Sequence, residues 1–137
     1  MNINGVEIFA TGNWNGDEFS SDDLDAMIEA FPVVGFQVPL KLGHDDTSGA
    51  PAYGWVSAIR RKGDKLVADF TDIGPDLYAA IKSRRYDAVS AEIFFNLHRN
   101  GMSYRRVLKA VALLGAEIPA VSYLAPIHTA LRDSPVI

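Results

Sequence analysis

Short extended runs joined by tight turns constrain the fold of this chain more than any other feature. Residues 53–61 (YGWVSAIRR) and 65–72 (KLVADFTD) flank the turn KGD, which is the clearest hairpin signal in the sequence. Strands that are linked mainly by hairpins favour an antiparallel arrangement. We therefore expect a mainly β fold of the α+β class, either a curled antiparallel sheet or a small closed β-barrel. Further extended runs cover residues 6–10, 37–43, 87–97 and 103–115.

Two or three helices are expected to flank this sheet. In SSDDLDAMIEAFP, apolar residues recur at helical spacing, Ser20 or Ser21 can cap the N-terminus, and Pro32 ends the helix. A second short helix is expected in GPDLYAAIKSRR, with Pro75 near its first turn. The C-terminal stretch IPAVSYLAPIHTALRDSPVI contains three prolines, which predicts loop with at most one short helix. No repeat or linker divides the chain, so we expect one domain over residues 1–137, with a core at 3–124 and a tail at 125–137.

Composition excludes several functional classes. The 137 residues carry 17 acidic and 13 basic side chains, a net charge of −4, which argues against a general phosphate-binding surface. The absence of cysteine excludes disulfides, thiolate metal sites and a cysteine nucleophile. The N-terminus lacks the pattern of a signal peptide, and no apolar run is long enough to span a membrane. We therefore expect a soluble intracellular protein with no nucleic acid or membrane partner.

Two polar side chains occupy unusual positions. Ser90 lies in the middle of a predicted strand, between Val89 and Ala91, where a hydroxyl has little structural reason to be. His44 follows the extended run VPLKLG and would stand at a strand end, where an imidazole could act as a general base. A serine bonded to backbone and a solvated loop histidine remain the plainer interpretations. The pattern HDD is a weak metal motif, so neither a metal nor a cofactor is expected.

The order of four motifs resembles the tailed-phage prohead proteases, particularly the branch found in Mu-like phages and prophages. The motifs are His44-Asp45 after a strand, Gly54-Trp55-Val56, the strand RRYDAVSAEIF with Ser90, and Pro119-Ala120. The similarity runs in order over roughly residues 38–124. The resemblance implies a fold like that of the herpesvirus assemblins, a closed or nearly closed β-barrel surrounded by helices.

The same resemblance implies a serine endopeptidase that matures the phage prohead in the host cytoplasm. Ser90 would be the nucleophile and His44 the general base. The expected substrates are phage capsid and scaffold proteins and the chain itself, with self-association as a further possibility. A non-catalytic head scaffold or assembly protein on a degenerate protease domain is the alternative. A barrel that binds single-stranded nucleic acid through Trp14, Tyr53, Trp55 and Phe94 is disfavoured by the net charge.

The third catalytic residue does not carry over from the resemblance. Related proteases place a histidine or carboxylate on the strand after the serine, whereas LKAVALL offers Ala110 and Ala112. Of the carboxylates nearby, we prefer Glu117, and a dyad without an acid stays open. For the oxyanion, backbone N–H groups at Gly115 and Ala116 or the side chains of Arg105 and Arg106 are the candidates. The other candidate acids are Glu92, Asp45 and Asp46.

Overall fold

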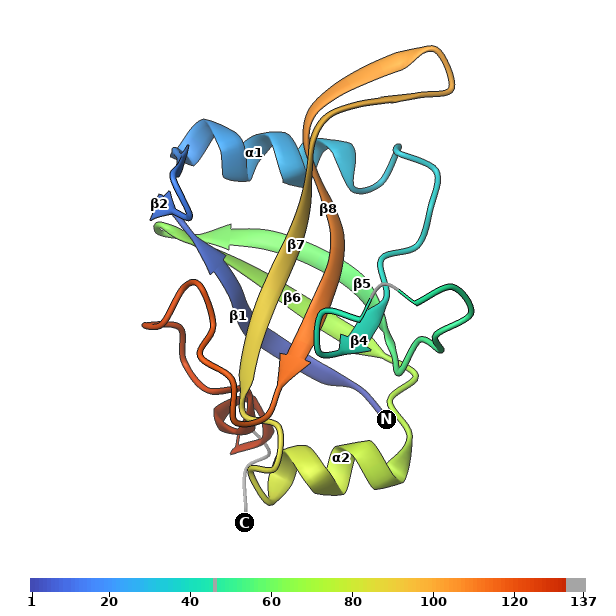
Figure 1. Cartoon of the computed structure of the whole chain (residues 1–137), viewed down its shortest axis with the longest axis vertical. Coiled ribbons are helices and arrows are strands. Elements are labelled where there is room, and N and C mark those ends of the chain that lie inside the picture. Colours follow the sequence, from blue (N-terminus) through green and yellow to red (C-terminus); the bar gives the residue numbers. More distant parts are fainter. Residues whose placement is uncertain (46, 133–137) are drawn as a thin grey trace.

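Two three-stranded sheets form most of the computed structural model, which describes residues 1–45 and 47–132 (Figure 1). The first sheet has the order β1-β6-β5 and is antiparallel throughout. Its β5–β6 hairpin is the one predicted from the sequence, and Gly63 occupies the turn with φ 63°. The strands of this sheet are β1 (Ile3–Ala10), β5 (Trp55–Lys62) and β6 (Lys65–Thr71).

The second sheet has the order β4-β8-β7 and contains β4 (Leu40–Leu42), β7 (Ala88–Arg99) and β8 (Met102–Leu114). The β7–β8 pair is the second predicted hairpin, and it crosses the first sheet and extends past the helix α1 (Figure 1). The three-residue β4 pairs parallel to β8, which differs from the antiparallel expectation. Parallel pairing is possible here because a long connection, which contains β5, β6 and β7, separates the two strands in the chain.

The two sheets are joined along one side and do not close into a barrel. An isolated bridge pairs Pro39 with Trp55, and the Val56 N–H donates to the Val38 carbonyl at 2.8 Å. Among the described strands, no ladder joins β1 to β7 on the other side. The fold is therefore a mixed α+β arrangement of mostly strands, and the closed barrel expected as one alternative is absent from the described residues.

Helix α1 (Ser21–Ala30) begins and ends where the sequence predicts. Ser20 is its N-cap, and the Ser20 backbone N–H donates to Asp23 Oδ2 at 2.7 Å, half of a capping box. Leu24 and Met27 are fully buried on the face that packs against β8. The predicted second helix is α2 (Pro75–Lys82), and the C-terminal stretch contains the short 3₁₀ helix η1 (Ile127–Arg132).

A small ribbon of β2 (Gly12–Trp14) and β3 (Asp17–Phe19) was not expected. It forms because Asn15 and Gly16 both adopt positive φ, which matches the twist of a two-residue hairpin turn. The main core lies between the two sheets and includes buried side chains of both. Ile127 belongs to this core, so packing continues past residue 124, and residues 133–137 lie outside the described part. Within residues 1–45 and 47–132, no helix is long and apolar enough to cross a bilayer.

Candidate active site

One face of the second sheet collects the polar residues singled out in the sequence. Ser90 on β7 stands opposite Ala112 on β8, and Lys41 on β4 stands opposite the same alanine. Residues that pair directly across strands project to the same face, so Lys41, Ala112 and Ser90 form one row. Glu92, two residues after Ser90, lies on this face in the next row, opposite Ala110. The other face of the sheet is the core.

Small side chains in the central strand allow a polar contact between the outer strands. Ala110 and Ala112 are buried at 2% and 0% exposure. Above them, Lys41 Nζ lies 3.2 Å from Glu92 Oε1 and 3.1 Å from Oε2. β4 and β7 are two strand spacings apart, about 10 Å, and a lysine crosses this gap only if the strand between them carries short side chains. The alanines found in place of an expected catalytic group therefore give Lys41 and Glu92 room to meet.

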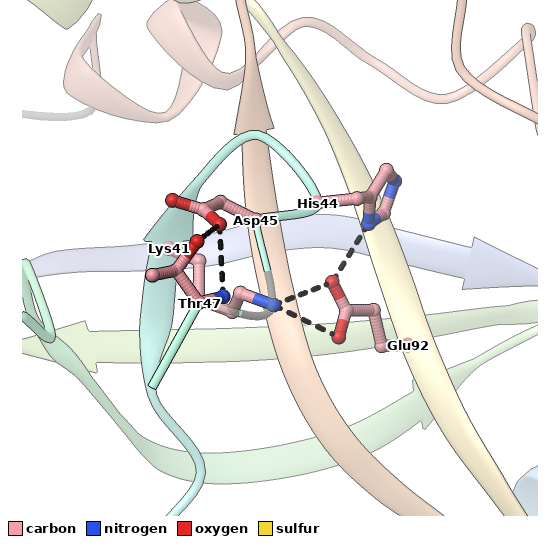
Figure 2. A network of polar contacts seen from close by, with 5 residues as sticks. All are labelled: Lys41, His44, Asp45, Thr47 and Glu92. Carbon is pink, nitrogen blue, oxygen red and sulfur yellow. Dashed lines mark hydrogen bonds and ion pairs between the residues drawn. The ribbon is translucent and has the colours of Figure 1, made fainter. Parts of the chain in front are cut away.

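His44 is held at the end of β4 by a tight turn. Gly43 has φ 65° and its N–H donates to the Leu113 carbonyl at 2.8 Å, which ties the turn to β8. His44 Nδ1 lies 2.7 Å from Glu92 Oε2, and the other ring nitrogen points away from this carboxylate (Figure 2). The Glu92 side chain is 13% exposed and that of His44 is 44% exposed. An Nδ1–H that donates to Glu92 leaves Nε2 as a proton acceptor.

Ser90 lies beside this pair without contacting it through a hydrogen bond. Its side chain is half-buried, and within the described residues its hydroxyl forms no hydrogen bond, either to backbone or to His44. The Ser90 hydroxyl is therefore not bonded to neighbouring backbone, as the plainer interpretation of the sequence had it. Alternate residues on a strand are about 7 Å apart, which places Ser90 next to the carboxylate that holds the imidazole.

The carboxylate on His44 is Glu92 and not the preferred Glu117. Glu117 is exposed beyond the end of β8, and its Oε1 would lie 3.9 Å from a Cβ added at Gly43, so it is near the turn without bonding the imidazole. Asp45 accepts from the Thr47 N–H at 2.9 Å on the side of the loop away from the His44 ring (Figure 2). Asp46 lies outside the described residues. The sequence signal for Glu92 was its i+2 spacing from Ser90 on one strand.

The two sets of residues considered as oxyanion donors lie at different distances from Ser90. Gly115 and Ala116 lie directly after the C-terminal end of β8, close to the turn that carries His44. Arg105 instead forms an ion pair with Asp23 of α1, and the Arg106 guanidinium lies over the Phe95 ring at 4.4 Å. Both arginines are six or seven residues from Ala112 along β8, about 20 Å, which excludes them as donors at Ser90.

The other two histidines form pairs elsewhere. His98 Nδ1 lies 2.8 Å from Ser103 Oγ on the exposed β7–β8 hairpin. His128 Nδ1 lies 2.7 Å from Asp87 Oδ1, and Arg84 Nε donates to Asp87 Oδ2 at 2.8 Å. Burial alone would raise the pKa of Asp87, but the hydrogen bonds from Arg84 and His128 outweigh it and hold this pKa below the usual range for an aspartate. Sequence reasoning did not identify this second pair, because neither partner carries a local motif.

Within residues 1–45 and 47–132, no group of three or more potential metal ligands converges. Comparison with family models and with curated proteins does not identify a relative. No family model matches the sequence, and no curated protein matches it. The interpretation of the site therefore rests on its own geometry together with the motif resemblance.

Proposed function

We propose that this protein is a serine endopeptidase with Ser90 as nucleophile, His44 as general base and Glu92 as the acid that orients the base. The observation that carries the proposal is the 2.7 Å contact between His44 Nδ1 and Glu92 Oε2 on the strand face that bears Ser90. In serine hydrolases a carboxylate on Nδ1 fixes the tautomer in which Nε2 accepts the serine proton. The free hydroxyl of Ser90 is consistent with a group kept for reaction.

The chemistry follows from this arrangement. The Ser90 Oγ proton moves to His44 Nε2 while Oγ attacks the substrate carbonyl, and the carboxylate of Glu92 stabilises the imidazolium. The protonated His44 then donates this proton to the leaving amine, which breaks the peptide bond and leaves an acyl group on Ser90. His44 then takes a proton from water as the water oxygen attacks the acyl carbonyl. The bond from Ser90 Oγ to the acyl carbon breaks, the protonated His44 returns the proton to Oγ, and the new carboxyl terminus of the substrate leaves. A shift of the exposed His44 ring brings Nε2 to Oγ, since catalytic hydrogen bonds are often formed only with substrate bound.

Lys41 is a positioning residue in this proposal. Its ammonium contacts both oxygens of Glu92 and fixes the carboxylate in the plane that faces His44. The same positive charge weakens the electrostatic support that Glu92 gives to the imidazolium. Glu92 therefore acts more by orienting the ring than by stabilising its charge.

The proposed substrates follow from the motif resemblance. They are the scaffold and capsid proteins of a tailed-phage prohead and the chain itself, cleaved inside the assembling head in the host cytoplasm, with no cofactor. An assemblin-like fold is part of the same proposal, which the α+β arrangement of two joined sheets supports.

A fluorophosphonate probe tests the proposal directly. We expect the probe to label the full chain at one site, and Ser90→Ala and His44→Ala to abolish labelling. Ser103→Ala and His98→Ala are matched controls, because these residues form an exposed hydroxyl–imidazole pair that contacts no carboxylate of the described residues. Labelling that survives Ser90→Ala, or that is lost in Ser103→Ala, would refute the assignment.

A non-catalytic head scaffold or assembly protein is the second candidate. The observation in its favour is that Ser90 and His44 form no hydrogen bond, whereas Glu92 is engaged in an ion pair with Lys41. In that case the Lys41–Glu92–His44 network holds the loop after β4 and performs no chemistry. Absence of labelling and of peptide cleavage in the assembled head would favour this candidate.

A further inference from the structure

A groove of about 310 Å³ opens on the same sheet face as the proposed catalytic residues, further along β7. Phe94 lies two residues beyond Glu92 on this strand, and Pro39 lies two residues before Lys41 near β4, so the groove occupies the row next to the Lys41–Glu92 contact. The groove is therefore adjacent to the proposed site. The side chains used below to argue its chemistry are Phe36, Pro39, Phe94, Leu97, Arg99 and Lys109.

The walls of the groove are apolar and aromatic. The rings of Phe36 and Phe94 meet edge to face with centroids 6.1 Å apart, and both side chains are only partly buried. Leu97 and Pro39 extend the apolar surface. A surface of this kind gains free energy by taking up a large apolar side chain.

Positive charge is concentrated at the groove, and none of its described lining residues is acidic. Lys109 Nζ lies 5.3 Å from the centroid of the Phe94 ring, and within the described residues this ammonium has no carboxylate partner. Arg99 is already engaged, since its Nε donates to the Val34 carbonyl at 2.9 Å and its guanidinium lies over the Phe36 ring. Lys109 is thus the cation free to bind an acidic ligand, on a chain whose net charge is −4.

We infer that this groove is a substrate subsite that selects peptide segments with an aspartate or glutamate two positions from a large apolar residue; the inference rests on the proposed peptidase function. Phe94 is four residues from Ser90 on the same strand, about 13 Å, and an extended substrate along β7 spans this distance with about four residues. The apolar residue binds between Phe36 and Phe94, about four positions from the scissile bond. Alternate side chains of an extended segment project to the same side, so the carboxylate two positions from the apolar residue binds Lys109.

The test is cleavage of a diverse library of synthetic peptides by the full chain, with the cleaved bonds identified by mass spectrometry. We expect cleaved peptides to be enriched in an apolar residue about four positions from the cleaved bond, with an acidic residue two positions from the apolar one. Lys109→Glu should shift the preference between acidic and basic residues at this second position, measured as a ratio of kcat/KM values, by about tenfold. Lys82→Glu, at an exposed position in α2, is the matched charge reversal and should leave the ratio unchanged.

Fluorophosphonate labelling separates failure of the subsite from failure of the peptidase. Labelling of the wild-type protein reports on Ser90, so it tests the peptidase separately from the groove. A wild-type protein that labels and cleaves with the same preference as Lys109→Glu would overturn the subsite. A change in self-association in Lys109→Glu, with cleavage preference unaltered, would assign the groove to a second copy of the chain and also overturn it. A wild-type protein that neither labels nor cleaves would refute the peptidase and the subsite together.

Discussion

Two glutamates lie near the turn that carries His44, the proposed base, and they differ in whether they contact its imidazole. Glu92 bonds His44 Nδ1, whereas Glu117 lies exposed near Gly43. The side chain that orients a catalytic histidine must touch the ring, because it acts by selecting the tautomer. At the residue scale, the proposed mechanism therefore depends on Glu92 and not on the acid that the sequence favoured.

Glu92→Gln keeps the shape of this side chain and removes its charge. We expect kcat to fall by about 10²–10⁴-fold with little change in KM, because the amide no longer fixes the productive tautomer. Glu117→Gln is the matched control and should leave both constants close to the wild-type values. Steady-state kinetics on a cleaved peptide make the comparison. An equal loss in the two variants would contradict the assignment of Glu92.

At the scale of elements, the short strand β4 and the turn after it position His44, the proposed base. Gly43 has φ 65°, a conformation that costs a side-chain-bearing residue about 1–2 kcal/mol. Gly63 in the β5–β6 turn has φ 63°, so an alanine at this position would be strained by about as much as one at position 43, at a site remote from His44.

Gly43→Ala and Gly63→Ala should lower the free energy of unfolding by similar amounts, measured by urea denaturation. Only Gly43→Ala should also slow fluorophosphonate labelling, because it displaces the turn that carries His44. If Gly63→Ala slows labelling as much, the effect is one of global stability and the turn has no special role in positioning the base.

Local signals in the sequence predicted the two hairpins and α1, because apolar periodicity, caps and turn residues act over a few positions. Contacts between segments that are far apart in the sequence could not be predicted from such local patterns. The parallel pairing of β4 with β8 depends on the packing of both sheets, and the His44–Glu92 contact joins residues 48 positions apart across a strand. Ser90 and His44 were identified as candidates because each is an unusual residue type for its local position. The carboxylate that contacts His44 could only be narrowed to several candidate acids, of which Glu92 was one.

At the scale of the whole molecule, Asp87 ties the C-terminal stretch to the start of β7. Its carboxylate accepts from Arg84 and from the backbone N–H of His128, and its carbonyl accepts from the Ile127 N–H at 3.1 Å. Ile127 is buried in the main core, so this link closes the fold between distant segments. Asp87 thus contributes to stability and lies outside the proposed catalytic face.

The stability supplied by Asp87 should depend on pH. Its pKa is lowered in the folded state, so the stabilisation is fully present above the unfolded pKa of about 4 and is lost as the pH falls through the lower folded pKa. Asp87→Asn should cost about 1–3 kcal/mol at pH 7 and progressively less below about pH 4. Urea denaturation across this range measures the difference. The exposed Asp64→Asn should show neither effect, and a difference for Asp87→Asn that grows on acidification would contradict the linkage.

A crystal structure of the full chain after reaction with a fluorophosphonate is the most direct test of the central claim. We predict phosphorus bonded to Ser90 Oγ, His44 Nε2 within about 3 Å of the adduct oxygens, and Nδ1 still on Glu92. Phosphorus on any other side chain, or an unmodified Ser90 with His44 turned away from it, would contradict the proposed active site.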